Sequence, residues 1–105
     1  MAKPVRLRSR ATQDIDSAVD HYQRERGDAV AARFIDAVER ALKRIGRHPH
    51  AGALRFSYDL DIPYLRYVTL ARFPYLVFYR EAEDDIDVWR VLHTRRDLPT
   101  ILADS

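Results

Sequence analysis

Two stretches of the sequence decide the fold: Arg72-Phe73-Pro74-Tyr75-Leu76-Val77-Phe78-Tyr79-Arg80 and Ile86-Asp87-Val88-Trp89-Arg90-Val91-Leu92-His93. Both are rich in β-branched and aromatic side chains, which fit a pleated sheet better than a helix. The acidic segment between them, residues 81–85, has the length and polarity of a hairpin loop. The sequence therefore predicts a β-hairpin at the centre of a sheet.

Strict alternation along a strand predicts which of these side chains share a face. On the first strand one face would carry Tyr75, Val77 and Tyr79, and the other Leu76, Phe78 and Arg80. On the second strand one face would carry Ile86, Val88, Arg90 and Leu92, and the other Trp89, Val91 and His93. Both faces are substantially apolar, so both need a cover. One helical hairpin can shield one face, and we favour a partner protein as the second cover, with folding back of residues 51–63 and the C-terminal segment as the alternative.

Two amphipathic helices precede the hairpin. Ser9 is the expected N-cap of the first helix, with Thr12 as the competing start, and Gly27 is its expected end. Asp28 is the expected N-cap of the second helix, which should stop near His48 because Pro49 and Gly52 follow.

Short strands are predicted at residues 5–8, which alternate apolar and basic side chains, and at residues 65–70. Residues 100–102 predict a short terminal helix. The element order is then β-α-α-β-β-β, an α+β fold in which a helical hairpin packs on one face of a mainly antiparallel sheet. With 105 residues, the chain has the size of one domain, residues 1–105.

The composition excludes several classes of protein. The chain has no cysteine, which rules out disulfides, thiolate metal sites and a cysteine nucleophile and suits a reducing cytoplasm. No apolar run approaches the roughly 20 residues of a membrane span, and the N-terminus lacks the apolar region of a leader peptide. A formal charge of +2 is too weak to establish nucleic-acid binding. We therefore expect a cytoplasmic protein.

Familiar catalytic and metal-binding motifs are missing from the sequence. It contains no glycine-rich phosphate loop, no Gly-x-Ser-x-Gly elbow and no His-Glu-x-x-His helix. His48 and His50 would offer a metal two imidazoles, but without a third ligand they indicate a solvated turn. The sequence predicts no cofactor and no metal.

The most polar cluster near the C-terminus consists of Arg90, His93, Arg95, Arg96 and Asp97. Its guanidinium groups could hold a phosphate or a carboxylate, with His93 exchanging a proton near neutral pH. Alternatively, Arg96 and Asp97 clamp the C-terminal turn and His93 is a half-buried strand residue. We favour the structural interpretation.

A second set joins arginine and aromatic side chains along the predicted strands: Arg66, Arg72 and Arg80 with Tyr67, Phe73, Tyr75 and Tyr79. Such a set could stack bases and grip phosphates. It could also be the edge of the core, or a face that binds another protein, where Tyr, Trp and Arg are favoured. We rank protein binding first.

The start of the first predicted strand at Phe73-Pro74-Tyr75 and the ending Arg90-Val91-Leu92-His93-x-x-Arg96-Asp97 resemble the C-terminal signature of one protein family. This family is the ParE branch of the RelE/ParE toxins, also known as plasmid-stabilisation proteins. Residues 11–22 and 34–52 resemble the helical hairpin of the same family and its exit. The resemblance therefore covers nearly the whole chain.

The resemblance implies the toxin of a type II toxin-antitoxin system, neutralised by binding a cognate ParD-like antitoxin. ParE relatives inhibit DNA gyrase, so gyrase is the expected target, and DNA would be contacted only through the antitoxin. We expect target binding by Arg80, Arg90, His93, Arg95 and Arg96. We expect antitoxin binding by Tyr67, Tyr75, Tyr79 and Trp89, together with the surface of the helical hairpin.

Two alternatives remain open at this stage. RelE relatives cut mRNA on the ribosome, and here Arg80, Arg90 and His93 would be the catalytic groups. No tyrosine follows position 79, so His93 would have to act as the general acid, and this departure favours a protein that is not a nuclease. The second alternative is an inactive member that only completes a regulatory complex on operator DNA.

Overall fold

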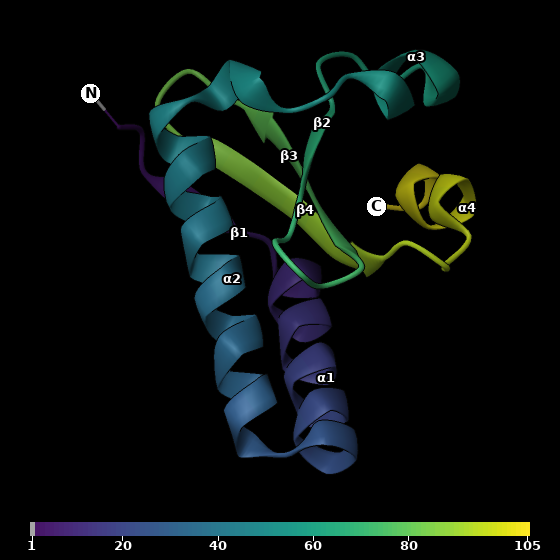
Figure 1. Ribbon diagram of the computed structural model, residues 1–105. Coiled ribbons are helices and arrows are strands. Elements are labelled where there is room, and N and C mark those ends of the chain that lie inside the picture. The colour runs from purple at the N-terminus through teal and green to yellow at the C-terminus, as the bar shows by residue number, and fades with distance from the viewer. Residues whose placement is uncertain (1) are drawn as a thin grey trace.

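The computed structural model describes residues 2–105 and has the predicted α+β fold (Figure 1). Its elements, in chain order, are β1 (Val5–Leu7), α1 (Ser9–Arg26), α2 (Asp28–Arg47), a 3₁₀ turn (Pro49–Ala51), α3 (Arg55–Leu60), β2 (Arg66–Thr69), β3 (Tyr75–Glu81), β4 (Ile86–His93) and α4 (Leu98–Ala103). The predicted order of strands and helices is confirmed. The sequence patterns left residues 51–63 undefined, and the structure forms α3 there.

The four strands form one sheet in the order β1-β4-β3-β2. β3 and β4 lie in the centre and are antiparallel, as predicted, and β2 is antiparallel to β3. β1 is parallel to β4, with Val5 opposite Ile86, and the long connection that a parallel pair needs is formed by all the elements between them, α1 to β3. The sheet is therefore mainly antiparallel with one parallel edge.

Both predicted N-caps are wrong, although both helices begin where the sequence indicated. Ser9 is the first residue of α1, because the N–H of Arg8 still donates to the carbonyl of Val88 at 3.0 Å and keeps Arg8 extended. Gly27, at φ 91°, lies between the two helices and serves as the end of one and the start of the next. Such a short link places Asp28 inside α2 already, and its carboxylate accepts from the side chain of Gln23 at 2.9 Å.

A β-bulge in the central hairpin changes the predicted faces of β4. Phe78 lies opposite Arg90, but the next residue, Tyr79, lies opposite Val88, so Trp89 has no partner in the ladder. After the bulge the alternation shifts by one residue. Val91 therefore packs with Ile86 and Val88 toward the helical hairpin, while Leu92 joins Trp89 on the other face. The prediction for Val91 and Leu92 was wrong because strict alternation assumes an uninterrupted ladder.

The two faces of the sheet carry two separate hydrophobic clusters. One cluster lies under α1 and α2 and includes Phe34, Ile45 and Val77. The other lies under α3 and α4, where Phe56 and Leu102 cover the opposite face (Figure 1). The prediction that a partner protein covers this face is wrong, because the alternative, folding back of the chain itself, is what the structure shows. The second face therefore needs no partner protein to exclude water.

The hydroxyl of Tyr79 joins β3 to the exit of α2. The side chain is completely buried, and its Oη donates to the carbonyl of Pro49 at 2.6 Å and accepts from the N–H of Gly52 at 3.1 Å. A Cβ atom at Gly52 would lie only 2.9 Å from Cε1 of Tyr79 and 3.0 Å from Cβ of Arg66. Only glycine therefore lets the chain pass this close to the ring.

We expect Tyr79→Phe to lower the free energy of unfolding by about 1–3 kcal/mol, because it leaves the buried N–H of Gly52 and the partly buried carbonyl of Pro49 without their partner. Urea denaturation measures this difference. Tyr58→Phe is the matched control, since the Tyr58 side chain is 78% exposed and its hydroxyl is free to bind water. Equal stability of the two variants would contradict a structural role for the Tyr79 hydroxyl.

Candidate functional site

The polar cluster predicted near the C-terminus gathers where β4 ends beside the start of β3 and the first half of α1. A hollow of about 150 Å³ opens there, lined by Asp14, Ser17, Ala18, Tyr75, Val91, His93 and Arg96. α1 contributes one wall and the two central strands contribute the other. The sequence predicted this cluster from residues of the strand and the turn alone. It did not predict that α1 also contributes side chains to it.

Arg90 is held inside this cluster by Asp14 of α1. Its Nε and Nη2 each donate to the carboxylate at 2.8 Å, and the N–H of Val91 donates to the same carboxylate at 3.0 Å. Both charged side chains are only 12% exposed. The hydrogen bond to Asp14 raises the pKa of Arg90 above its ordinary value, although burial opposes it. Arg90 therefore fixes α1 against β4. Its Nε and Nη2 donors, which were expected to contact a target, are used in the pair with Asp14.

His93 is half-buried at the end of β4. Its ring centroid lies 5.2 Å from that of Tyr75, in an edge-to-face arrangement. Nδ1 accepts from the backbone N–H of Arg95 at 3.0 Å, which places the ring proton of the neutral imidazole on Nε2. Burial, followed by the charge of Arg95, lowers the pKa of His93 below its ordinary value of 6.5. At neutral pH His93 is an uncharged residue that shapes the turn.

Arg95 and Arg96 lie on the exposed turn between β4 and α4. The backbone N–H of Arg96 donates to the carbonyl of His93 at 3.0 Å, which closes the turn. Within residues 2–105 neither guanidinium forms an ion pair. Within the predicted target set, these two side chains are therefore unpaired charges on an exposed turn; the guanidinium of Arg80 also has no ion pair within residues 2–105, but it lies elsewhere.

Arg80 lies at a different place on the sheet. Its guanidinium is 5.8 Å from the ring centre of Trp89, and that of Arg8 is 4.3 Å from the same ring. Arg80 is five residues along β3 from Tyr75, which is about 17 Å for an extended strand. The five predicted target residues therefore do not form one surface.

Arg8 was not singled out from the sequence, although a signal for it was present. Basic side chains alternate at positions 6 and 8, and acidic ones at positions 85 and 87. The parallel register brings the two rows together: Arg6 pairs with Asp85 at 3.0 Å and Arg8 with Asp87 at 2.8 Å.

The rings expected to bind the antitoxin lie largely in the core of the chain. Tyr79 is completely buried and Trp89 is 7% exposed. Tyr67 is half-buried and packs on Phe56, with ring centroids 5.5 Å apart. Tyr75 is half-buried as well and packs on the helical hairpin. This burial speaks against a free binding surface made of all four rings, because Tyr79 and Trp89 have almost no area to offer.

The geometry also bears on RNA cleavage. A nuclease would need Arg80, Arg90 and His93 around one phosphate. Here Arg90 is bound to Asp14, Nδ1 of His93 is occupied by the turn, and Arg80 lies beside Trp89 farther along the strand. The three groups do not converge on a common point.

The two histidines considered as metal ligands do not belong to a larger cluster. Within residues 2–105 no group of three His, Cys, Asp or Glu side chains is placed to hold a metal ion. Nε2 of His50 instead lies 2.8 Å from the carboxylate of Glu81. A hydrogen bond from Lys3 lowers the pKa of that carboxylate, and His50 contributes to the same effect. None of the helices in the described part of the chain is long and apolar enough to cross a bilayer.

Comparison with known proteins identifies a family and similar solved structures. Residues 5–98 match the family model of the ParE toxin of the type II toxin-antitoxin system, parDE. A solved structure described as "Chromosomal ParDE TA system from P. aeruginosa" has a similar fold, with a TM-score of 0.73 and 24% sequence identity, over 88% of this chain and 96% of that chain. No curated protein matches the sequence.

We expect Asp14→Asn to lower the free energy of unfolding by about 3 kcal/mol, because it leaves the guanidinium of Arg90 buried without its counter-charge. Thermal or urea unfolding measures the loss. Asp16→Asn is the matched control on the same helix, since Asp16 is exposed and forms no ion pair within residues 2–105. A similar loss of unfolding free energy in both variants would contradict a stabilising role of the ion pair between Arg90 and Asp14.

His93 should make stability depend on pH. Because its pKa is lower in the folded chain than in the unfolded chain, the unfolded state binds more protons as the pH falls below about 6.5, and folding is then disfavoured. We expect the wild type to lose more stability between pH 7 and pH 5 than His93→Asn, whose amide oxygen can still accept from Arg95. Parallel curves of unfolding free energy against pH for the two proteins would argue against this titration.

Proposed function

Because the chain belongs to the ParE toxin family of type II toxin-antitoxin systems, we propose that it inhibits DNA gyrase in the bacterial cytoplasm and is held inactive by a cognate ParD-like antitoxin. The observation that carries this proposal is the family match over residues 5–98, which includes the whole cluster at the end of β4.

The chemistry of the site favours binding over catalysis. Its two free cations, Arg95 and Arg96, lie on a turn that is closed by hydrogen bonds to His93. A turn ordered in this way loses little conformational entropy when it binds. Its guanidinium groups suit the carboxylates of a protein surface. We assign target contact to Arg95 and Arg96, and a positioning role to Arg90 and His93.

The proposed mechanism is differential binding. A toxin that binds gyrase holding cut DNA more tightly than gyrase with resealed DNA shifts the population toward the cut state. Such a toxin needs no catalytic group of its own.

For the antitoxin we propose contact with the outer surface of the helical hairpin and with the exposed parts of Tyr67 and Tyr75. Ile35 lies on α2 and is 39% exposed, which gives an apolar point of contact on that surface. Tyr79 and Trp89 are left out of this proposal because they are buried.

We expect the purified protein to reduce supercoiling of relaxed plasmid by gyrase and to increase the amount of cleaved plasmid recovered after protein denaturation. Replacing both arginines of the turn (Arg95→Ala with Arg96→Ala) should raise the half-inhibitory concentration about tenfold or more, as expected when a binding hot spot is lost. The control Arg10→Ala with Arg24→Ala removes the same charge from exposed positions of α1 and should inhibit like the wild type.

The proposal fails if gyrase is unaffected at toxin concentrations that arrest growth. Cleavage of mRNA during that arrest would identify a ribosome-dependent endonuclease instead. If growth does not arrest when the chain is expressed without its antitoxin, the chain is instead an inactive member that only completes a regulatory complex.

A further inference from the structure

A groove rich in arginine runs between α2 and the turn that connects β2 to β3. It has a volume of about 560 Å³ and carries Arg26, Arg33, Arg40 and Arg72, with Asp36 as its acidic residue. A smaller hollow of about 210 Å³ shares Arg40 with it and adds Arg44. The two hollows therefore form one continuous surface, called here the arginine groove.

The positive charge of the arginine groove is not neutralised within the chain. Five arginines and one aspartate leave four positive charges there, although the whole protein has a formal charge of only +2. Within residues 2–105 none of these arginines takes part in an ion pair, and only Arg44 has a hydrogen bond, to the carbonyl of Thr69 at 3.3 Å. Arginine forms bidentate pairs with phosphate and with carboxylate. The groove is therefore suited to an anionic ligand.

The apolar lining of the arginine groove consists mostly of small side chains. These are Ala37, Ala41 and Ala71, joined by Val30. Phe73 also borders the groove, but its ring packs edge-on against Tyr22 and Phe34, with centroids 5.2 and 5.3 Å away. No other aromatic residue lines the groove, so a platform for stacking unpaired bases is lacking. The ligand must be held mainly by charge.

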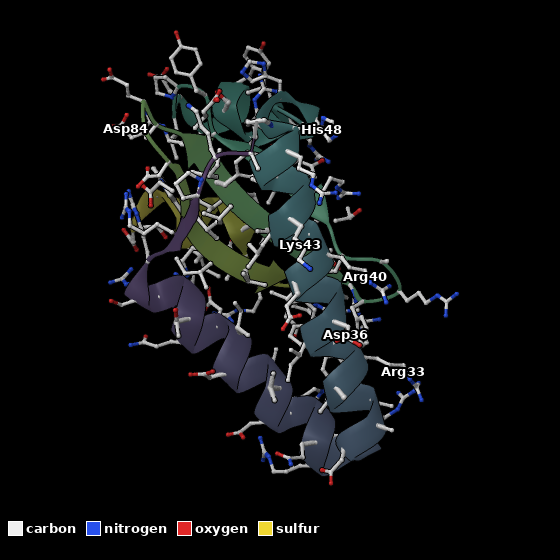
Figure 2. All side chains as sticks on the ribbon, turned by 90° about the vertical axis from the view of Figure 1, so that its left-hand side faces the viewer. Arg33, Asp36, Arg40, Lys43, His48 and Asp84 are labelled. Atoms are coloured by element: carbon white, nitrogen blue, oxygen red, sulfur yellow. The ribbon has the colours of Figure 1, made fainter. Side chains whose placement is uncertain are left out.

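The spacing of the arginines indicates a polymer with repeated charges. Arg33, Arg40 and Arg44 follow one another on α2 and cover about 17 Å of helix axis. Figure 2 shows Arg33, Asp36, Arg40 and Lys43 in sequence along this helix. A single small anion would meet only part of such a row. Duplex DNA carries about one negative charge per 1.7 Å and is rigid over this length, like the helix.

We propose that the arginine groove binds the phosphate backbone of duplex DNA, without reading its sequence. This departs from the expectation that DNA is contacted only through the antitoxin. The inference does not depend on gyrase being the target, and its test contains neither gyrase nor an antitoxin.

Fluorescence anisotropy with a labelled duplex of about 20 base pairs tests the proposal, with the dissociation constant measured at several salt concentrations. Binding should weaken steeply with salt. Arg33→Gln with Arg40→Gln should weaken binding and reduce the slope of log affinity against log salt by about 1.8, because each phosphate contact contributes about 0.9. Arg72→Gln alone, on the turn, should reduce the slope by about half as much.

The control Arg10→Gln with Arg24→Gln removes the same net charge from α1, outside the groove, and should leave the slope unchanged. Circular dichroism of each variant verifies that it is folded. An equal loss in the groove and control variants would overturn the proposal, since net charge alone would explain the binding. Tighter binding of RNA or single-stranded DNA of the same length would also overturn it. So would competition by polyglutamate as effective as that by unlabelled duplex, which would point to an acidic protein.

Discussion

The central pair of strands, β3 and β4, is apolar on both faces, and the rest of the molecule is arranged to keep water away from both. The helical hairpin covers one face, and α3 and α4 cover the other. A small domain buries a limited fraction of its surface, so a chain of 105 residues has few large side chains left over once both faces are filled. Aromatic rings that were predicted from the sequence to bind a partner are instead buried in the two clusters, above all Tyr79 and Trp89. Among residues 2–105 the large apolar side chains that stay exposed are Ile35, Tyr58 and Tyr64.

The bulge at Trp89 decides which charged groups meet. By shifting the alternation of β4, it turns Val91 toward the helical hairpin, and the N–H of Val91 and the side chain of Arg90 both reach Asp14. The same shift brings His93 beside Tyr75, where burial lowers the pKa of the ring and Nδ1 holds the following turn. Arg90 and His93 thus act as supports, and the turn that they support carries the free cations Arg95 and Arg96. This division suits a protein that acts by binding, because a nuclease would need the supporting groups to reach a phosphate themselves.

Within residues 2–105, the arginines that form no ion pair include those of the turn after β4 and those of the arginine groove beside α2. The basic residues in and next to β1 are used differently, since Lys3, Arg6 and Arg8 are paired with acidic residues of β3, β4 and the loop between them. Charge that is paired within the chain contributes to its stability, whereas unpaired charge remains available for a ligand. Although the net charge of the chain is only mildly positive, its unpaired positive charge is distributed unevenly over the surface.

The sequence alone determined the parts of this protein that depend on local pattern. The alternation of residues 5–8, the helical periodicity before Gly27 and after it, and the two aromatic strands were sufficient for the order of elements and the α+β class. The residues of the strand start and of the C-terminal ending were sufficient for the family. The tertiary structure alone decided the faces of β4 beyond the bulge, the pairing of Asp14 with Arg90 across 76 positions of sequence, and the joining of α2 with the β2–β3 turn in one groove. The physical reason is that local periodicity reports only which way neighbouring side chains point. Which distant groups then meet depends on strand register and on how helices pack, and a single inserted residue in a ladder changes both.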